Sequence, residues 1–220
     1  MERKRFLRES LLGFGAIVAL PSVIASCKKN NDDSSSGCAV SPEETNGPYP
    51  ILTPAQLVRS TIIGDRTGVA LLMTITVQDK SNGCTPLADV LVDVWHCDKD
   101  GNYSQYNSYT SATFLRGRQT TDSNGQVSFI SIFPGWYSGR APHIHIEVLT
   151  TGGTSLLISQ IAFPESVYNT VYASSGYNGV PDTTNTDDGI FEDSLSANLA
   201  NSCTGNVTDG YTLNKTLVVE

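Results

Sequence analysis

Residues 130–145 read Ile130-Ser-Ile-Phe-Pro-Gly-Trp-Tyr137-Ser-Gly-Arg140-Ala-Pro-His143-Ile-His145, a pattern typical of a strand, a turn and the start of another strand. The second strand carries two of the three histidines in the chain. Because side chains alternate between the faces of a strand, His143 and His145 share one face and lie about 6–7 Å apart along it. Ile144 and Ile146 point to the opposite face and predict a core there. The two imidazoles can therefore share one metal ion.

Apolar or alternating runs bounded by Gly, Asn and Pro turns predict further strands. Helical patterns are few, with one or two turns over residues 53–59 and one short helix over residues 164–173. This balance predicts an all-β fold, a two-sheet β-sandwich with long loops and one or two short helices. The expected strands are residues 68–77, 90–95, 126–132, 143–150, 155–162 and 212–219.

A β-sandwich alone implies no chemistry. The turn and strand motifs at residues 86–92, 121–129 and 134–137 also occur in structural modules that resemble transthyretin. A non-catalytic extracellular scaffold or ligand-binding module is therefore the alternative hypothesis.

The N-terminal 26 residues resemble a bacterial lipoprotein signal. A basic start is followed by an uncharged run, residues 11–25, which is too short for a transmembrane helix and ends close to Cys27. A signal peptide over residues 1–26, with a lipid on Cys27, predicts an exported protein anchored in the bacterial cell envelope. The polar, serine-rich residues 27–37 are expected to form a flexible tether, and residues 38–220 the domain.

The charge of the chain disfavours several partners. The chain has 14 Lys and Arg against 22 Asp and Glu. Removing residues 1–26 takes away four basic and two acidic residues, which leaves a net charge of about −10. This acidic excess argues against nucleic-acid binding and leaves the lipid anchor as the expected contact with a membrane.

Four cysteines follow Cys27, and none forms a CxxC pair, so a zinc knuckle is disfavoured. An even number of cysteines in an exported protein predicts two disulfides. Cys84 and Cys97 flank a predicted strand, which would hold them farther apart than the roughly 7 Å that a disulfide allows. Two connectivities stay open, with Cys38 bonded to either Cys84 or Cys97 and Cys203 bonded to the other.

Two tyrosines are candidates to join the histidines. Tyr137 lies six residues before His143, and Tyr103 lies in the loop after the strand that ends at Trp95. A phenol has a pKa near 10, so it binds as phenolate at neutral pH only beside a strongly polarising cation. Ferric iron is such a cation, and the four side chains predict a site with two nitrogen and two oxygen ligands.

Other metal sites fit less well. Glu147 shares the histidine face, but three ligands at i, i+2 and i+4 on a strand span about 13 Å, beyond the reach of one ion. A zinc site with three histidines would need His96, which follows Trp95 in the opposite strand register. His96 is therefore expected to be buried and hydrogen-bonded instead.

Over residues 42–162, and more faintly to the C-terminus, the chain resembles the intradiol ring-cleavage dioxygenases. This non-haem Fe(III) family includes protocatechuate 3,4-dioxygenase and catechol 1,2-dioxygenase. Several ordered motifs carry the resemblance, which makes it far more specific than a lone His-x-His. They are Thr45-Asn-Gly-Pro-Tyr49-Pro, Val94-Trp-His-Cys-Asp-Lys-Asp-Gly-Asn-Tyr103-Ser, Phe114-Leu-Arg-Gly-Arg-Gln-Thr-Thr-Asp-Ser-Asn-Gly125, and Pro134-Gly-Trp-Tyr137 with Arg140-Ala-Pro-His-Ile-His145.

The resemblance implies an enzyme that uses O2 to cleave a catechol between its two hydroxylated carbons, giving a cis,cis-muconate-type product. One Fe(III) per chain is implied, and Tyr137 is the ligand that leaves it and takes a proton when substrate binds. Only a tether precedes Cys38, so the helical dimer of the catechol-type enzymes is not expected, although another homo-oligomer is possible. The implied residues are the metal ligands Tyr103, Tyr137, His143 and His145, the catalytic and substrate-binding Arg140 and Gln160, and Tyr49 in the substrate pocket.

Overall fold

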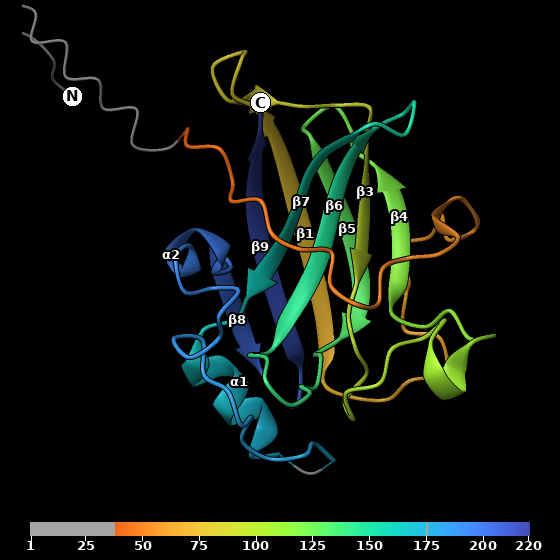
Figure 1. The fold of residues 1–220 in the computed structure, drawn as a ribbon, viewed down its shortest axis with the longest axis vertical. Helices are drawn as coiled ribbons and strands as arrows, with labels where there is room; N and C mark the ends of the chain where they lie inside the picture. The colour runs from red at the N-terminus through yellow and green to blue at the C-terminus, as the bar shows by residue number, and fades with distance from the viewer. Residues whose placement is uncertain (1–37, 175) are drawn as a thin grey trace, which may run out of the picture. The chain divides into compact units, whose positions relative to one another are not determined.

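The computed structural model describes residues 38–174 and 176–220 (Figure 1). The predicted signal peptide and tether, with Cys27, lie outside the described residues. The described strands are β1 (Ala70–Asp79), β2 (Thr85–Pro86), β3 (Val90–Trp95), β4 (Arg116–Thr120), β5 (Gln126–Ile132), β6 (His143–Thr150), β7 (Ser155–Ala162), β8 (Ser202–Asn206) and β9 (Gly210–Val219). The helices are α1 (Glu165–Tyr172), α2 (Leu195–Asn198) and the 3-10 turns η1 (Pro54–Gln56) and η2 (Asn107–Tyr109).

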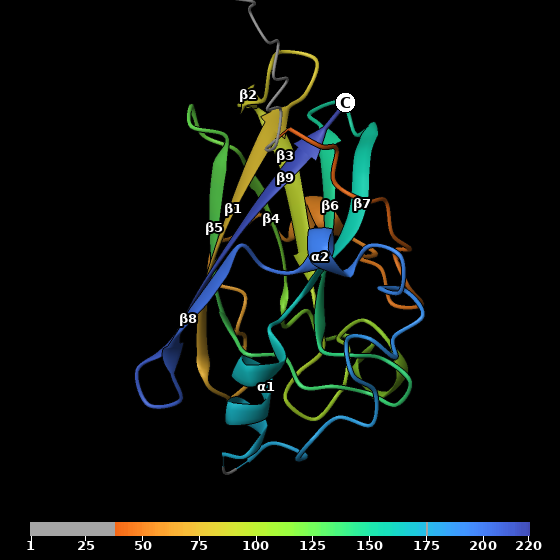
Figure 2. The same cartoon turned by 90° about the vertical axis from the view of Figure 1, so that its left-hand side faces the viewer.

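The strands form two layers, as expected for a β-sandwich (Figures 1 and 2). One sheet has the order β2-β1-β9-β8, with β5 also paired to β1, and the other has the order β4-β3-β6-β7. Pairing is antiparallel except between β1 and β9, which run parallel. The fold class predicted from the sequence is therefore confirmed.

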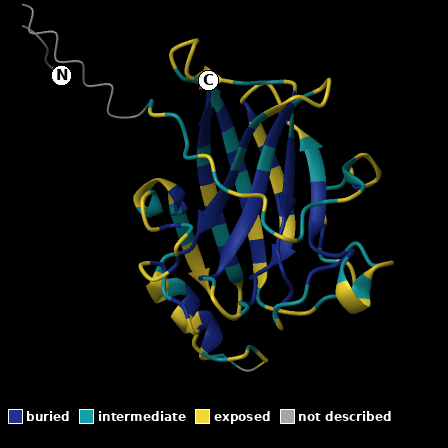
Figure 3. Cartoon of the chain, viewed as in Figure 1, coloured by how far each residue is buried: buried dark blue, intermediate teal, exposed yellow. Residues whose placement is uncertain are grey.

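The core lies between the sheets and follows the alternation of each strand. In β1 every second residue from Leu71 to Val77 is buried, and Ile144 and Ile146 of β6 pack into the same core. Figure 3 shows that buried residues lie along the strands of the sandwich. Burying one such aliphatic side chain contributes about 1.5–3 kcal/mol relative to leaving it exposed. This inward packing confirms the predicted apolar face of β6.

The outer face of β6 is covered as well. His143 and His145 point away from the core, yet they are only 3% and 1% exposed. An N-terminal strap, residues 38–50, crosses this face (Figure 1). Its Glu44 N–H donates to the carbonyl of Ile158 at 2.8 Å, which attaches the strap to β7. The strap therefore encloses the face on which the two histidines lie.

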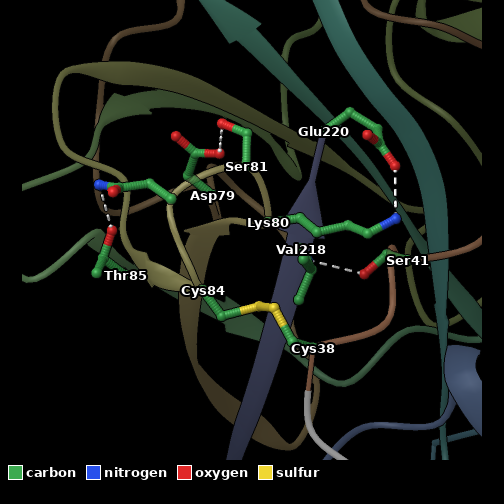
Figure 4. Close-up of a disulfide and its surroundings, with 10 residues drawn as sticks. Cys38, Ser41, Asp79, Lys80, Ser81, Cys84, Thr85, Val218 and Glu220 are labelled. Atoms are coloured by element: carbon green, nitrogen blue, oxygen red, sulfur yellow. Dashed lines mark hydrogen bonds and ion pairs between the residues drawn. A yellow bond between two sulfur atoms is a disulfide. The ribbon is translucent and has the colours of Figure 1, made fainter. Parts of the chain in front are cut away.

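A disulfide fixes the start of the strap. Cys38 is bonded to Cys84 in the turn between β1 and β2 (Figure 4). The prediction of two disulfides is wrong, because Cys97 and Cys203 are both free among residues 38–174 and 176–220. Cys97 follows β3 in one sheet and Cys203 lies on β8 in the other, so the two thiols belong to different layers.

Three strands were not predicted, namely β2, β4 and β8, whereas the other six lie close to their expected positions. The helix expected over residues 164–173 is confirmed as α1, but the pattern over residues 53–59 gives only the single turn η1. Within the described part of the chain, no helix has the length and apolar character needed to cross a membrane.

Candidate metal centre

The site begins as a row of side chains across the four-stranded sheet. Residues in register on neighbouring strands present their side chains to the same face. Here the row runs from β4 through β3 and β6 to β7, on the outer face. Its members are Arg116, Trp95, His145 and Gln160. His143 lies two residues before His145 and extends the row along β6.

His143 and His145 aim their Nε2 atoms at one point. These two atoms are 3.1 Å apart, and Nε2 of His143 is 3.3 Å from the phenol oxygen of Tyr137. Two nitrogen ligands bound to one ion at about 2.1 Å, with an angle of about 90–110° between them, are about 3.0–3.4 Å apart. The observed separations lie within hydrogen-bond range and also match those of ligands that share an ion.

Both imidazoles are neutral. Nδ1 of His143 donates to the carbonyl of Ala141 at 2.6 Å, which leaves the lone pair on Nε2. His145 stacks on Trp95 with ring centroids 5.0 Å apart, and its Nδ1 has no hydrogen-bond partner among the described residues. Burial lowers the pKa of His143 to about 3 and the pKa of His145 well below its usual value. Neutral imidazole is the form that binds a metal ion.

Tyr103 enters from the loop that follows β3. Asp98 fixes this loop, because its carboxylate accepts hydrogen bonds from two backbone N–H groups of the loop. The Tyr103 ring lies 5.9 Å from the Tyr137 ring and 6.2 Å from the His145 ring, centroid to centroid. Its phenol oxygen is buried without a hydrogen-bond partner in residues 38–174 and 176–220. Such an unpaired polar atom needs an explanation, and a bound metal ion would provide it.

The two phenols do not ionise readily without a cation. Burial raises the pKa of Tyr103 well above its ordinary value. Burial also raises the pKa of Tyr137, although the charge of Arg140 opposes that effect. A strongly charged cation is therefore required for either phenol to bind as phenolate. Two neutral imidazoles and two phenols form a donor set that fits ferric iron.

The strap brings Tyr49 to the phenols. The Tyr49 ring stacks on that of Tyr103 at 4.8 Å and lies 6.5 Å from that of Tyr137, centroid to centroid. Just before it, Gly47 lies against His145, where a Cβ atom on Gly47 would come within 2.8 Å of the imidazole Cε1. Gly47 also has a φ of +66°, a conformation that glycine adopts without strain. Glycine therefore lets the strap pass directly over the histidine.

Arg116 belongs to the site although the sequence did not single it out. It is fully buried and donates to the carbonyls of Ser104 and Tyr49. Its guanidinium lies 5.7 Å over the ring of Tyr103. Burial lowers the pKa of Arg116 to about 10, so it stays charged at neutral pH. Its register with Trp95 places it on the histidine face, and this register is known only from the folded chain because β4 was not predicted.

Arg140 and Gln160 form the opposite side of the site. Nη2 of Arg140 donates to Oε1 of Gln160 at 2.6 Å, and Nε2 of Gln160 donates to the carbonyl of Thr45 in the strap at 2.8 Å. Nε of Arg140 donates to both oxygens of Asp188, at 3.0 and 2.9 Å. Asp188 comes from a polar loop before α2. Sequence reasoning missed it, because that loop has no periodic pattern or motif.

The two side chains rejected as ligands lie in other environments. His96 is fully buried, with Nδ1 2.8 Å from the carbonyl of Cys97 and Nε2 2.7 Å from Oγ of Ser131, which confirms its expected environment. Glu147 lies opposite Asp93 in register. In the described part of the chain, no three His, Cys, Asp or Glu side chains form a group that could hold a metal ion. A metal centre here therefore depends on the phenols.

A family model described as "Dioxygenase" matches residues 52–175. Chlorocatechol 1,2-dioxygenase of Rhodococcus opacus is 34% identical over 142 residues, which are 54% of this chain and 52% of that protein. The protocatechuate 3,4-dioxygenase beta chain of Burkholderia cepacia is 31% identical over 113 residues, 46% of this chain and 47% of that one. The chain thus spans about half the length of these curated relatives.

Solved structures match over more of their length. An intradiol ring-cleavage dioxygenase from Tetranychus urticae has a TM-score of 0.75 and 32% identity, with 83% of this chain and 95% of that chain covered. The dioxygenase domain of a carbohydrate-binding fusion protein from Streptomyces sp. SirexAA-E has a TM-score of 0.63 and 26% identity, with 83% and 99% covered. The chain therefore belongs to the intradiol ring-cleavage dioxygenase family.

Proposed function

We propose that this protein is a non-haem Fe(III) dioxygenase that cleaves a catechol between its two hydroxylated carbons with O2, giving a cis,cis-muconate-type product. The convergence of the His143 and His145 Nε2 atoms, 3.1 Å apart with the phenols of Tyr103 and Tyr137 beside them, carries this proposal. Bound by these four side chains, ferric iron would draw electron density from a chelated catechol and so open its ring to O2.

Tyr137 is proposed to accept a catechol proton at its phenol oxygen. It is half-buried and next to the exposed Ser138 and Gly139, whereas Tyr103 is enclosed. Tyr137 is therefore the phenol with room to move away from the metal. Since phenol and catechol hydroxyls have similar acidity, a released phenolate is a base of suitable strength for this proton.

Arg140 is proposed to stabilise negative charge that develops on the substrate. Its hydrogen bond to Gln160, which is in register with His145, supports this role, and its positive charge acts on both Tyr137 and His143. Asp188 and Gln160 engage its Nε and Nη2 atoms, while Nη1 makes no hydrogen bond to the described residues. Because these two contacts hold the planar guanidinium in place, its remaining N–H groups point in a fixed direction. Gln160 would contribute chiefly by holding Arg140 in this position.

Tyr49 is proposed to line the substrate pocket. Its ring is half-buried, stacks on Tyr103 and lies edge-on to Tyr137. An aromatic face at this position can pack against a planar catechol ring.

We also propose that the protein is exported and anchored by a lipid on Cys27. The basic and apolar pattern of the first 26 residues supports export, and so does the Cys38–Cys84 disulfide, because disulfides persist in oxidising compartments. Cell fractionation tests this, with the wild type expected in the membrane fraction and Cys27→Ser in the soluble fraction. Wild-type protein in the cytosolic fraction would contradict the proposal.

An oxygen-electrode screen with catechol, protocatechuate and hydroxyquinol tests the proposed activity. Iron-loaded protein should consume O2 in equal amount to the catechol it cleaves, and the ring-opened diacid should be detectable by mass. If no catechol causes oxygen uptake although iron is bound, the non-catalytic scaffold or ligand-binding module becomes the better account.

A further inference from the structure

We infer that Asp188 is a positioning residue that fixes both Arg140 and His143, and so aligns the charge-stabilising group with a metal ligand. The inference rests on the proposed function, because it assigns a task to a residue beside that site. Asp188 is fully buried, in the loop between α1 and α2, and lies 48 residues after Arg140 in the chain.

The Asp188 carboxylate is surrounded by three N–H donors. Nε of Arg140 bridges both oxygens, at 3.0 Å to Oδ1 and 2.9 Å to Oδ2. The backbone N–H of Ile190 donates to Oδ1 at 2.9 Å, and that of Ala141 donates to Oδ2 at 2.8 Å. Both oxygens must therefore accept. The Arg140 guanidinium and the Asp188 carboxyl group therefore form an ion pair in a buried place.

The contact with Ala141 extends to the metal ligand. Ala141 donates its backbone N–H to Asp188, and its carbonyl accepts a hydrogen bond from Nδ1–H of His143 at 2.6 Å. That bond selects the tautomer whose lone pair is on Nε2, the atom aimed at the metal position. Asp188 thus holds the Arg140–Ala141 peptide group, and the next peptide group along the chain presents the carbonyl that orients the His143 ring.

The Asp188 loop also supplies the surface between the two groups. Its Phe191 ring lies 5.6 Å under the guanidinium of Arg140 and 6.5 Å from the ring of His143. The N–H of Phe191 donates to the carbonyl of Asp188 at 2.9 Å, which fixes the loop that carries the ring. Arg140 is therefore held by a carboxylate on one edge, by Gln160 on another, and by an aromatic face beneath.

Asp188→Asn tests this assignment, with Asp187→Asn as the matched control. The amide keeps the size of the carboxylate but turns an N–H group toward one of the three donors. Because partners that orient metal ligands typically contribute about 10–100-fold, Asp188→Asn should lower kcat at least tenfold and weaken iron binding by a similar factor. Asp187 is exposed and bonds only Thr184, so Asp187→Asn should match wild type.

A double-mutant cycle with Arg140→Gln separates positioning from stability. If Asp188 acts on turnover through Arg140, adding Asp188→Asn to Arg140→Gln should change kcat by less than about threefold, while the weaker iron binding persists because it runs through His143. If Asp188→Asn does not fold, Asp188→Glu replaces it, since it keeps the charge and displaces the carboxylate by one methylene.

Two failures are distinguishable. Wild-type protein that binds iron but cleaves no catechol overturns the proposed function, and the iron affinity of the variants still tests the contact with His143. If the Asp188→Asn and Asp187→Asn variants have the same iron affinity, visible spectrum and kcat, the positioning role of Asp188 is overturned.

Discussion

Gly47 is the strap residue that lies against His145, one of the proposed metal ligands. We predict that Gly47→Ala lowers bound iron and kcat/KM at least tenfold. The added methyl group would come within 2.8 Å of Cε1 of His145, so either the strap or the imidazole must move. The backbone φ of +66° adds about 1–2 kcal/mol of strain for any residue with a Cβ atom. Iron analysis and oxygen uptake measure the effect.

Gly153→Ala is the control for this backbone strain. Gly153 lies in the turn between β6 and β7 with a φ of +86°, and nothing lies within 4 Å of a Cβ atom there. This variant should lose stability but keep its iron and its activity. Equal losses of iron in the two variants would show that the contact between Gly47 and His145 is unimportant.

We predict that the titration of His96 accounts for part of the pH dependence of the free energy of unfolding. Its unfolded pKa is near 6.5, and burial lowers the folded pKa to about 4. The folded state therefore resists the proton that the unfolded state accepts. The stability contributed by neutral His96 is complete above pH 6.5 and is lost as the pH falls toward 4. Between pH 7 and pH 5 this loss is about 2 kcal/mol.

His96→Gln removes this titration while leaving a polar side chain for Ser131 and the Cys97 carbonyl. In urea unfolding of iron-free protein, the variant should lose about 2 kcal/mol less than wild type between pH 7 and pH 5. His143 and His145 titrate in both proteins, so their contribution cancels in the comparison. An identical acid loss in the two proteins would contradict the assignment.

The Cys38–Cys84 disulfide attaches the strap to the turn between β1 and β2 and stabilises the fold. Cys38 and Cys84 are 46 residues apart, and closing a loop of that length stabilises the folded state by about 4 kcal/mol in the chain-entropy model. We predict that Cys38→Ser lowers the free energy of unfolding by about 3–4 kcal/mol. Denaturant unfolding measures this, and a thiol reductant should lower the wild type to the level of the variant.

Cys203→Ser serves as the matched control, because Cys203 is a free, half-buried thiol on β8. Its effect should stay below about 1 kcal/mol, since it breaks no covalent bond. If reduction leaves wild-type stability unchanged, the disulfide does not hold the strap.

Most strands could be predicted because one of their faces packs in the core. Alternation identified β1, β3, β5, β6, β7 and β9, whose inward side chains are buried. The missed β4 reads Arg-Gly-Arg-Gln-Thr, and its polar side chains bind partners far away in sequence, such as Asp93 for Arg118. The missed β8 is a polar edge strand. Local hydrophobicity cannot identify strands that are stabilised by such long-range polar contacts.

Some residues of the candidate site could also be predicted from the sequence, and others could not. His143, His145, Tyr103 and Tyr137 lie together as the sequence predicted, because strand alternation and motif spacing constrain them. The disulfide partner of Cys38 stayed open, because pairing depends on how the strap crosses the sheet. Arg116 and Asp188 were missed, since only the folded chain shows what a buried charge contacts.

At the scale of the whole molecule, the sandwich keeps its core and its candidate chemistry on opposite faces of one sheet. The apolar core fills the space between the layers, while the histidine row lies on the outer face. Segments far apart in sequence cover that row, among them the strap, the loop after β3 and the loop that carries Asp188. Changes to this cover should therefore affect metal binding more than they affect the core.

Two imidazoles and two phenols of this sandwich are proposed to bind ferric iron. Metal content and visible absorption of the purified wild type, measured beside Tyr103→Phe, test it most directly. We predict about one iron per chain and a burgundy tyrosinate-to-iron band that shifts when catechol is added, with the band weakened or lost in Tyr103→Phe. A colourless wild type that holds stoichiometric zinc, or that takes up no metal when iron is supplied, would contradict ferric iron binding by these four side chains.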